Sequence, residues 1–358
     1  MARFHPLEVL EVRHDTRDAV VVTLKPSEEA EELFQFIPGQ YLTFRKKFDD
    51  TEVRRSYSIC SGIDDGVLQI AIKRVDGGAF SSWANESLKP GDTLEAMPPL
   101  GNFYIDPAPE EERHYLAFAG GSGITPVLSI IKSTLAREPK SRFTLVYANQ
   151  QLSSVMFKEE LEDLKNRYLD RLSIIHIFDL EGQEIDLFTG RIDDEKLEAL
   201  FTYWIHLPSI HTTFICGPEP MMLTIAEGLK KRGVAQENIK YELFTSAQPG
   251  RVARRKVSTE EQSTESQTTA IAILDGLERT FSMDKHNENL LDAALRHDMD
   301  APYSCKAGVC STCKAKILEG EVEMLVNHAL EDYEVEQGYV LSCQSYPLTD
   351  RVKFSYDE

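Results

Sequence analysis

Four cysteines in the last quarter of the chain constrain its fold more than any other feature. Cys305, Cys310 and Cys313 form a C-x4-C-x2-C run, and Cys343 follows after 29 intervening residues. Thiolates at this spacing are the ligands of a plant-type [2Fe–2S] cluster. The segment 301–313 is rich in small residues, which let backbone N–H groups reach the sulfur atoms. The sequence therefore predicts a loop that gathers four thiolates around two iron atoms.

Two other interpretations of these cysteines compete with an iron–sulfur cluster. Zinc also takes four thiolates, but its sites usually come as paired C-x2-C units. Scattered buried thiols are the second alternative. The two remaining cysteines, Cys60 and Cys216, lie far apart in apolar segments, so no structural disulfide is expected. The spacing favours iron and sulfur over both alternatives.

Composition and charge limit the classes of function. A length of 358 residues and a hydrophobic content of 42% allow two or three packed domains. A net charge of −20 argues against nucleic acid as a partner, because phosphate binding needs a basic surface. The first residues lack a signal-peptide pattern, and no apolar stretch reaches membrane-spanning length. A cytoplasmic protein with no membrane partner is expected.

Acidic residues are concentrated where the cysteines are. Residues 269–358 contain 17 Asp and Glu against 8 Lys and Arg, which is a net charge of −9. A merely solvated surface explains this charge. A face that steers docking onto a basic redox partner explains it equally well, so both interpretations stay open.

Three folding units and a linker are predicted along the chain. Residues 1–108 hold short β-like runs at 19–24, 40–44 and 68–72 between Gly and Pro turns, which is typical of an antiparallel β-barrel. Residues 109–249 alternate apolar strands with helices, which indicates a doubly wound α/β domain with a parallel sheet. The expected strands are 115–119, 143–147 and 213–216, and the expected helices are 126–135, 156–166 and 220–231.

Residues 250–268 are predicted to be a flexible interdomain linker, because the polar segment 258–269 has almost nothing to bury in a core. Residues 269–358 then predict a small α+β domain. Its elements are a hairpin turning at Asp275-Gly276, an amphipathic helix at 289–297 and the cysteine loop.

A short motif in the first unit offers the groups that a flavin needs. Arg55, Tyr57 and Ser58 supply a guanidinium for a pyrophosphate, an aromatic ring for stacking and a hydroxyl for a ring nitrogen. Taken alone, a surface strand with a satisfied tyrosine is the simpler explanation. Farther on, Lys73 and the segment 77–83 combine charge, glycines and hydroxyls ahead of a helix, an arrangement that suits phosphate groups.

A glycine-rich loop stands directly after one predicted strand and directly before a helix. Gly120, Gly121 and Gly123 allow close backbone approach to a pyrophosphate, and Thr125 and Pro126 open the helix. A plain strand-to-helix turn would not need three glycines. The loop therefore predicts a dinucleotide site.

A later strand of the same sheet ends at Cys216 and Gly217, which are expected to reach the same crevice. A buried structural thiol explains Cys216 as well as a functional one does.

In this order, these residues resemble the ferredoxin–NADP⁺ reductase superfamily fused to a C-terminal plant-type ferredoxin domain of the β-grasp fold. The resemblance covers nearly the whole chain and implies FAD, a [2Fe–2S] cluster and NADPH or NADH as cofactors. A flavin suits this combination because a hydride delivers two electrons while the cluster takes one. Within the superfamily, the chain is most similar to the reductase subunits of bacterial phenylacetyl-CoA epoxidases. This implies electron transfer to a di-iron epoxidase complex in aerobic phenylacetate catabolism.

The resemblance also implies a role for each matching residue. Arg55 would hold the FAD pyrophosphate, Tyr57 would stack on the isoalloxazine ring, and Ser58 would lie near flavin N5. The residues implied at the FAD diphosphate are Gly78, Ser81 and Ser82. Those implied at the nicotinamide nucleotide are Gly120, Gly121, Gly123, Thr125, Pro126, Cys216 and Gly217. Those implied at the reacting rings are Ser58, Cys216, Glu242 and Phe244. The implied cluster ligands are Cys305, Cys310, Cys313 and Cys343.

One stretch departs from the family pattern. Relatives often have a basic residue near 149–154 for the 2′-phosphate of NADP, but this chain has Asn, Gln, Leu and Ser there. Lys158, the first basic residue after the stretch, and Arg142, which precedes it, are candidates to contact such a phosphate. Serines and amides also bind phosphate, so NADPH and NADH both stay open, with the subfamily resemblance favouring NADPH.

No di-iron or haem ligand pattern is visible, so oxygenation is expected on a separate protein. One alternative is the same electron path serving another acceptor, such as a ring hydroxylase, an acyl desaturase or a hybrid-cluster protein. The other is a redox-sensing regulatory iron–sulfur protein, which would leave the flavin and nicotinamide motifs without a purpose.

Overall fold

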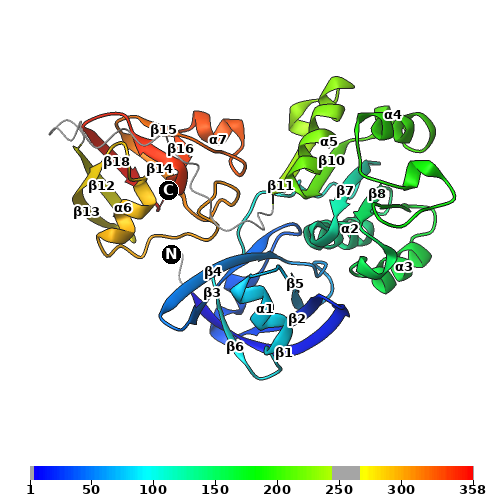
Figure 1. Cartoon of the computed structure of the whole chain (residues 1–358), viewed down its shortest axis with the longest axis horizontal. Coiled ribbons are helices and arrows are strands. Elements are labelled where there is room, and N and C mark those ends of the chain that lie inside the picture. The colour runs from blue at the N-terminus through cyan, green and yellow to red at the C-terminus, as the bar shows by residue number, and fades with distance from the viewer. Residues whose placement is uncertain (1–3, 244–266, 358) are drawn as a thin grey trace. The chain divides into compact units, whose positions relative to one another are not determined.

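The computed structural model describes residues 4–243 and 267–357, which form two compact units (Figure 1). The first unit joins a six-stranded sheet to a five-stranded sheet, and the second is built on a five-stranded sheet. Residues 250–266 of the predicted linker, and Phe244, lie outside the described residues, while Gln267 already belongs to a strand. The domain boundaries from the sequence stay predictions.

The six-stranded sheet forms the expected antiparallel barrel. Its strands are β1 (His5–Thr16), β2 (Ala19–Pro26), β3 (Tyr41–Phe48), β4 (Thr51–Ser58), β5 (Leu68–Lys73) and β6 (Thr93–Ala96). They run antiparallel in the order β4-β3-β6-β1-β2-β5. A bridge between Ile59 and Ile70 joins the outer strands β4 and β5, so the sheet closes. Helix α1 (Ala79–Glu86) adds Phe80 to the barrel core.

Strand β2 shows why a barrel strand can lack polar alternation. Val20 and Val22 belong to the barrel core, whereas Ala19 and Val21 belong to the core of the α/β part. Because successive side chains of a strand point to opposite faces, burial on both faces calls for a continuous apolar run. The run at 19–24 therefore marks a strand that the two cores share.

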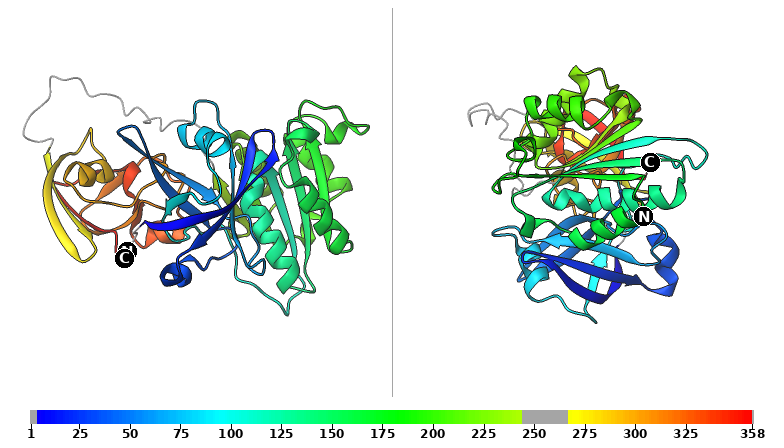
Figure 2. Two further views of the ribbon diagram at one scale, coloured as in Figure 1. Left: turned by 90° about the horizontal axis from the view of Figure 1, so that it is seen from below. Right: turned by 90° about the vertical axis from the view of Figure 1, so that its right-hand side faces the viewer.

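The second sheet is parallel and doubly wound, as expected. Its strands are β7 (His114–Gly120), β8 (Arg142–Asn149), β9 (Leu172–Phe178), β10 (Thr212–Gly217) and β11 (Ile239–Leu243), in the order β11-β10-β7-β8-β9. Helices lie on both faces (Figure 2), and they are α2 (Ile124–Arg137), α3 (Lys158–Arg167), α4 (Asp194–Tyr203) and α5 (Glu219–Lys231). The strand order reverses between β7 and β10, and ligands bind sheets of this kind at such a switch point.

Helix α2 is tied to the barrel by buried polar contacts. Ser129 Oγ donates a hydrogen bond to the Ser61 carbonyl oxygen at 2.6 Å, and Ser133 Oγ accepts one from the Ile63 N–H at 3.0 Å. Lys132, also on α2, pairs with Asp65 of the same barrel loop. These contacts hold the loop that follows β4 against α2.

The second unit has the α+β organisation expected of a β-grasp domain. Its main strands are β12 (Gln267–Leu274), β13 (Leu277–Asp284), β14 (Lys314–Glu319), β16 (Tyr339–Leu341) and β18 (Arg351–Ser355), in the order β13-β12-β18-β14-β16. A smaller sheet pairs β15 (Val322–Met324) with β17 (Ser345–Pro347), and the helices are α6 (Leu290–Arg296) and α7 (Asp332–Glu336). The last strand, β18, is central, parallel to β12 and antiparallel to β14.

The hairpin and helix predicted in this unit are both present. Asp275 and Gly276 both have positive φ angles, 54° and 72°, which is the conformation of a tight hairpin turn. The Asn289 side chain caps α6 by accepting a hydrogen bond from the Asp292 N–H at 2.8 Å. None of the described helices is both long and apolar enough to cross a membrane.

Candidate functional site

The structure brings the four predicted cluster cysteines together as two pairs. Cys305 and Cys310 place their Sγ atoms 3.1 Å apart, and the Cys313 thiol hydrogen bonds with Cys343. The first three lie in the loop between α6 and β14, and Cys343 lies in the turn after β16. All four are free thiols, and only Cys305 is not fully buried.

Backbone and side-chain contacts join the two segments that carry these cysteines. The Ser342 hydroxyl donates to the Cys313 carbonyl oxygen at 2.9 Å, and the Gln344 amide donates to the Lys306 carbonyl oxygen at 3.2 Å. The cysteine loop and the Cys343 turn are therefore held beside each other by groups other than the thiols.

The electrostatics of the thiols fit an iron–sulfur cluster. The hydrogen bond from Cys310 and backbone N–H groups, including that of Ala307 at 3.3 Å, lower the pKa of Cys305 to about 6. The neighbouring thiols and burial raise the pKa of Cys310 and of Cys313. Thiolates crowded in this way need cations beside them. No three His, Cys, Asp or Glu among the described residues converge on a single metal ion, whereas a two-iron cluster takes its cysteines in pairs.

The three residues of the proposed flavin motif lie on β4. Arg55 is exposed, and its Nη1 donates to the Arg54 carbonyl oxygen at 2.7 Å. Tyr57 is half-buried against Phe80, with ring centroids 5.6 Å apart. Ser58 is buried and donates a hydrogen bond from Oγ. Because successive side chains of a strand point to opposite faces, Tyr57 and Ser58 lie on opposite faces of β4 and contact different neighbours.

The polar groups of the loop before α1 form hydrogen bonds within the loop, which the sequence did not predict. The Ser81 hydroxyl is buried, accepts from the Val75 N–H at 3.1 Å and donates to the Gly78 carbonyl oxygen at 3.3 Å. Ser82 N–H donates to the same carbonyl at 3.0 Å. Lys73, at the end of β5, lies 3.6 Å from Asp18. A loop-closing role accounts for Ser81, and phosphate contacts by these residues stay predictions.

The two nucleotide motifs meet at the switch point of the parallel sheet. A Cβ atom at Gly123 would lie 2.2 Å from the Cys216 carbonyl oxygen, and one at Gly217 would lie 3.0 Å from Gly120 Cα. The ends of β7 and β10 thus touch through their backbones, which only glycine permits. Gly121 differs, because its φ is +53° and no atom lies within 4 Å of its would-be Cβ. It is the glycine of this loop with open space for a ligand.

The two other predicted residues of this loop, Thr125 and Pro126, form the first turn of α2. Thr125 Oγ1 donates to the Ser122 carbonyl oxygen at 3.0 Å, and Pro126 is buried in the first turn of α2. Both therefore shape the turn that carries the glycines.

A group of three residues forms where β4 meets β10 and β11. The Ser58 hydroxyl donates to Glu242 Oε2 at 3.2 Å, and Glu242 pairs in register with Cys216. Burial raises the pKa of Glu242 to about 8, although the Ser58 hydrogen bond acts in the other direction. Cys216 is fully buried, and its pKa is raised by burial and then by the Glu242 carboxylate. Burial thus favours the protonated form of the Glu242 carboxyl group beside the Ser58 hydroxyl.

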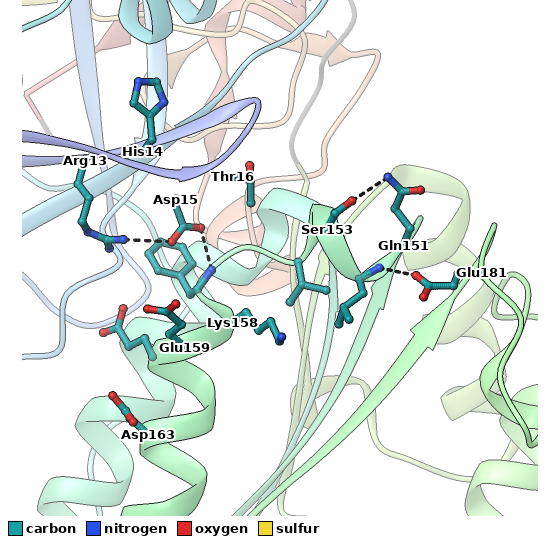
Figure 3. A pocket seen from close by; sticks show the side chains of 14 residues that line it. Arg13, His14, Asp15, Thr16, Gln151, Ser153, Lys158, Glu159, Asp163 and Glu181 are labelled. Carbon is teal, nitrogen blue, oxygen red and sulfur yellow. Dashed lines mark hydrogen bonds and ion pairs between the residues drawn. The ribbon is translucent and has the colours of Figure 1, made fainter.

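Sequence reasoning missed a cavity beside the carboxyl end of β8. Its volume is about 1010 Å³, and it is lined by the β1–β2 turn, the loop after β8 and the start of α3 (Figure 3). Lys158 lines it, as the search for a cation suggested. Arg142 does not line it, because it is the first residue of β8 and lies at the opposite end of that strand. A contribution of Arg142 to a 2′-phosphate site stays a prediction, and the cavity at this edge gives it no support.

Family models match three successive segments of the chain. Residues 7–105 match an oxidoreductase FAD-binding domain, residues 118–227 match an oxidoreductase NAD-binding domain, and residues 272–348 match a 2Fe-2S iron-sulfur cluster binding domain. The matches show that FAD, NAD(P)H and a [2Fe–2S] cluster are the cofactors.

Relatives of known function cover nearly the whole chain. One subunit of the 1,2-phenylacetyl-CoA epoxidase of Escherichia coli is 44% identical over 357 residues, 100% of this chain and 99% of that protein. The ferredoxin reductase component of the 3-ketosteroid-9-alpha-monooxygenase of Rhodococcus rhodochrous is 33% identical, over 98% of this chain and 96% of that protein. The solved structure of phthalate dioxygenase reductase shares the fold, with a TM-score of 0.60, 22% identity and 98% coverage of both chains.

Replacing Gly123 by alanine should separate the ends of β7 and β10. The new Cβ would need the space of the Cys216 carbonyl oxygen, so we expect a loss of about 1–3 kcal/mol in the free energy of unfolding and a raised KM for NAD(P)H. Thermal unfolding and steady-state kinetics measure the two effects. The control is Gly182→Ala, where the Cβ meets open space. Equal stability of the two variants would contradict the close contact.

Replacing Glu242 by glutamine should remove a pH dependence of stability. The folded state keeps a proton that the unfolded chain releases above the ordinary carboxyl pKa. The stability that this group contributes at low pH is therefore lost as the pH rises to about 8, with a slope of up to about 1.4 kcal/mol per pH unit. The slope of unfolding free energy against pH is measured by urea unfolding at several pH values between the ordinary carboxyl pKa and about 8. The fluorescence of Trp83 and Trp204 reports unfolding.

The matched control for this measurement is Glu237→Gln, which removes an exposed carboxylate just before β11. Equal slopes for wild type and Glu242→Gln would show that Glu242 does not hold the proton.

Proposed function

Because this chain belongs to the ferredoxin–NADP⁺ reductase superfamily, as a reductase component with FAD-binding, NAD-binding and [2Fe–2S] domains, we propose that it supplies electrons to a phenylacetyl-CoA epoxidase. One observation carries the choice of partner, namely the identity to the E. coli epoxidase protein along the full length of both chains. With its cofactors bound, the chain passes electrons from NAD(P)H through FAD and the cluster to an oxygenase.

The four paired cysteines are proposed to be the cluster ligands. Their support is the convergence of Cys305 with Cys310 and of Cys313 with Cys343, together with backbone N–H groups directed at Cys305. Sulfur atoms that receive such hydrogen bonds carry negative charge more readily.

The residues between the barrel and the sheet are proposed to position the reacting rings. Ser58 and Glu242 share a hydrogen bond. The raised pKa of Glu242 lets its carboxyl group donate or accept a proton next to the Ser58 hydroxyl. Cys216 supplies a buried, apolar wall and has its backbone at the glycine contact. Arg55, whose guanidinium is exposed, is proposed to hold the FAD pyrophosphate, with Tyr57 stacking on the ring. Phe244 is proposed only from the family resemblance.

The partner is proposed to be a di-iron oxygenase complex in the cytoplasm. The net charge of −9 over residues 269–358 supports docking onto a basic surface. The second candidate partner is a ring hydroxylase or another monooxygenase. It is supported by relatives that are reductase components of 3-ketosteroid and glycine betaine monooxygenases.

Replacing Cys310 by serine should separate the two halves of the electron path. We expect reduction of cytochrome c, a one-electron protein acceptor, to be abolished, while flavin-dependent reduction of ferricyanide by NAD(P)H is retained. The reason is that Cys310 belongs to a thiol pair of the second unit, whereas flavin and nucleotide bind the first. The control is Cys60→Ala, which removes a thiol buried in the first unit. Equal loss of both activities in Cys310→Ser would refute the relay.

Reconstitution tests the proposed partner. The purified reductase, NAD(P)H and the oxygenase subunits of a phenylacetyl-CoA epoxidase should convert phenylacetyl-CoA to its epoxide, with product measured by mass spectrometry. The control is the same mixture with Cys310→Ser. Coupling to a 3-ketosteroid or glycine betaine oxygenase at a higher rate would replace the epoxidase by the second candidate.

A further inference from the structure

A buried side-chain amide lies beside one of the paired cysteines. Gln344 follows Cys343 in the short helical turn Ser342–Gln344 and is only 9% exposed. Its Nε2 donates one hydrogen bond to the Lys306 carbonyl oxygen at 3.2 Å and another to Cys343 Sγ at 3.7 Å. An amide nitrogen carries two hydrogens, so it can serve both acceptors at once. One side chain therefore connects a sulfur of one cysteine segment to the backbone of the other.

The cysteine loop fixes the orientation of this amide. A carbonyl oxygen only accepts hydrogen bonds, so the contact with Lys306 assigns the nitrogen, rather than the oxygen, of the Gln344 amide to this side. Gly308 of the same loop has a φ of +75°, and a Cβ atom there would lie 3.0 Å from Gln344 Cγ. The stem of the glutamine is thus packed against the loop backbone, and its N–H group is held toward the Cys343 sulfur.

Two other cysteines receive hydrogen bonds from within the cysteine loop. The Ala307 N–H donates to Cys305 Sγ at 3.3 Å, and the Thr312 side chain hydrogen bonds with Cys310. Gln344 differs because it donates from the second cysteine segment and through a side chain. Its contribution can therefore be removed by substitution while the backbone donors of the loop stay in place.

A hydrogen bond to a ligand sulfur acts on the electron affinity of an iron–sulfur cluster. Reduction adds one negative charge, part of which lies on the sulfur atoms, and an N–H donor stabilises the more negative state. The unit that carries these cysteines opposes the added charge, since residues 269–358 have a net charge of −9. A neutral donor at the sulfur offsets this repulsion locally, without adding a charge of its own.

We infer that the Gln344 amide sets the reduction potential of the cluster, raising it by donating a hydrogen bond to the Cys343 sulfur. The inference goes beyond the proposed function and rests on its assignment of the cluster ligands. In the step concerned, the flavin loses one electron and the cluster gains it, while both amide hydrogens stay on Gln344 Nε2. By stabilising the reduced cluster, the amide favours the transfer of electrons out of the flavin.

The test is a redox titration of the full-length protein with its flavin and cluster, followed by the EPR signal of the reduced cluster. Gln344→Met keeps an unbranched side chain of similar length and removes both amide hydrogens. We expect the equilibrium constant for reducing the cluster to fall about tenfold, which is a midpoint potential about 59 mV lower. Iron and sulfide contents equal to those of wild type show that the variant still holds its cluster. An unchanged midpoint in such a variant would overturn the inference.

The matched control is Ser345→Ala, in the residue next to Gln344. The Ser345 hydroxyl is buried and donates to the Leu341 carbonyl oxygen at 2.9 Å. Its removal should lower the melting temperature, because a buried hydrogen bond is lost, and leave the midpoint potential at the wild-type value. A shift of equal size in both variants would show that loosening of this turn, rather than the hydrogen bond to sulfur, changes the potential.

A second measurement uses the wild-type chain and does not depend on how the variant folds. Glutamine labelled with a nitrogen isotope at its side-chain amide is incorporated, and pulsed EPR of the reduced cluster detects nuclei that share its unpaired spin. The hydrogen bond from Gln344 Nε2 to Cys343 Sγ should give a coupling to the labelled nitrogen. Absence of that coupling would overturn the inference even if Gln344→Met loses its cluster.

The outcomes separate this inference from the proposed function. An intact cluster with a wild-type midpoint in Gln344→Met would overturn only the role of the amide. A wild-type protein that binds no iron and sulfide, or whose cluster NAD(P)H cannot reduce through the flavin, would instead overturn the proposed function.

Discussion

The buried contact between α2 and the loop after β4 is the constraint on which the first unit depends. Ser58 comes from the barrel and Glu242 from the edge of the parallel sheet, so their hydrogen bond exists only if the two sheets keep a fixed relation. The hydrogen bond from Ser129 to Ser61, with the Lys132–Asp65 pair beside it, provides that relation. A buried carbonyl that lost its donor would cost about 1–3 kcal/mol, so the contact resists separation of the sheets. The geometry at the reacting rings is thus a property of the sheet interface.

Most of the fold could be predicted because its elements bury continuous apolar runs. The runs at 115–119, 143–147 and 213–216 became β7, β8 and β10, since helices cover both faces of the sheet. Turn residues predicted the barrel and the Asp275-Gly276 hairpin, because a tight turn depends on the backbone preferences of its own residues. The segment Asp194–Tyr203 was not predicted as a helix, and β9 and β11 were likewise not predicted as strands.

The site was predicted less completely, because contacts far apart in sequence decide its chemistry. The proximity of the cysteines follows from their spacing, but the proton on Glu242 depends on burial beside a strand 184 residues away. The Ser81 hydroxyl also closes its own loop, which the short motif did not indicate. Arg142 looked close to Asn149, yet a strand carries the two to opposite ends.

The central place of β18 also sets the order in which the second unit can mature. This strand contains the last regular residues of the chain, yet it lies between β12 and β14 and pairs with both. During synthesis, the hairpin of β12 and β13 and the cysteine loop emerge before the strand that joins them to β14. The sheet that supports both cysteine segments is therefore complete only once β18 has been synthesised, which is later than all four cysteines.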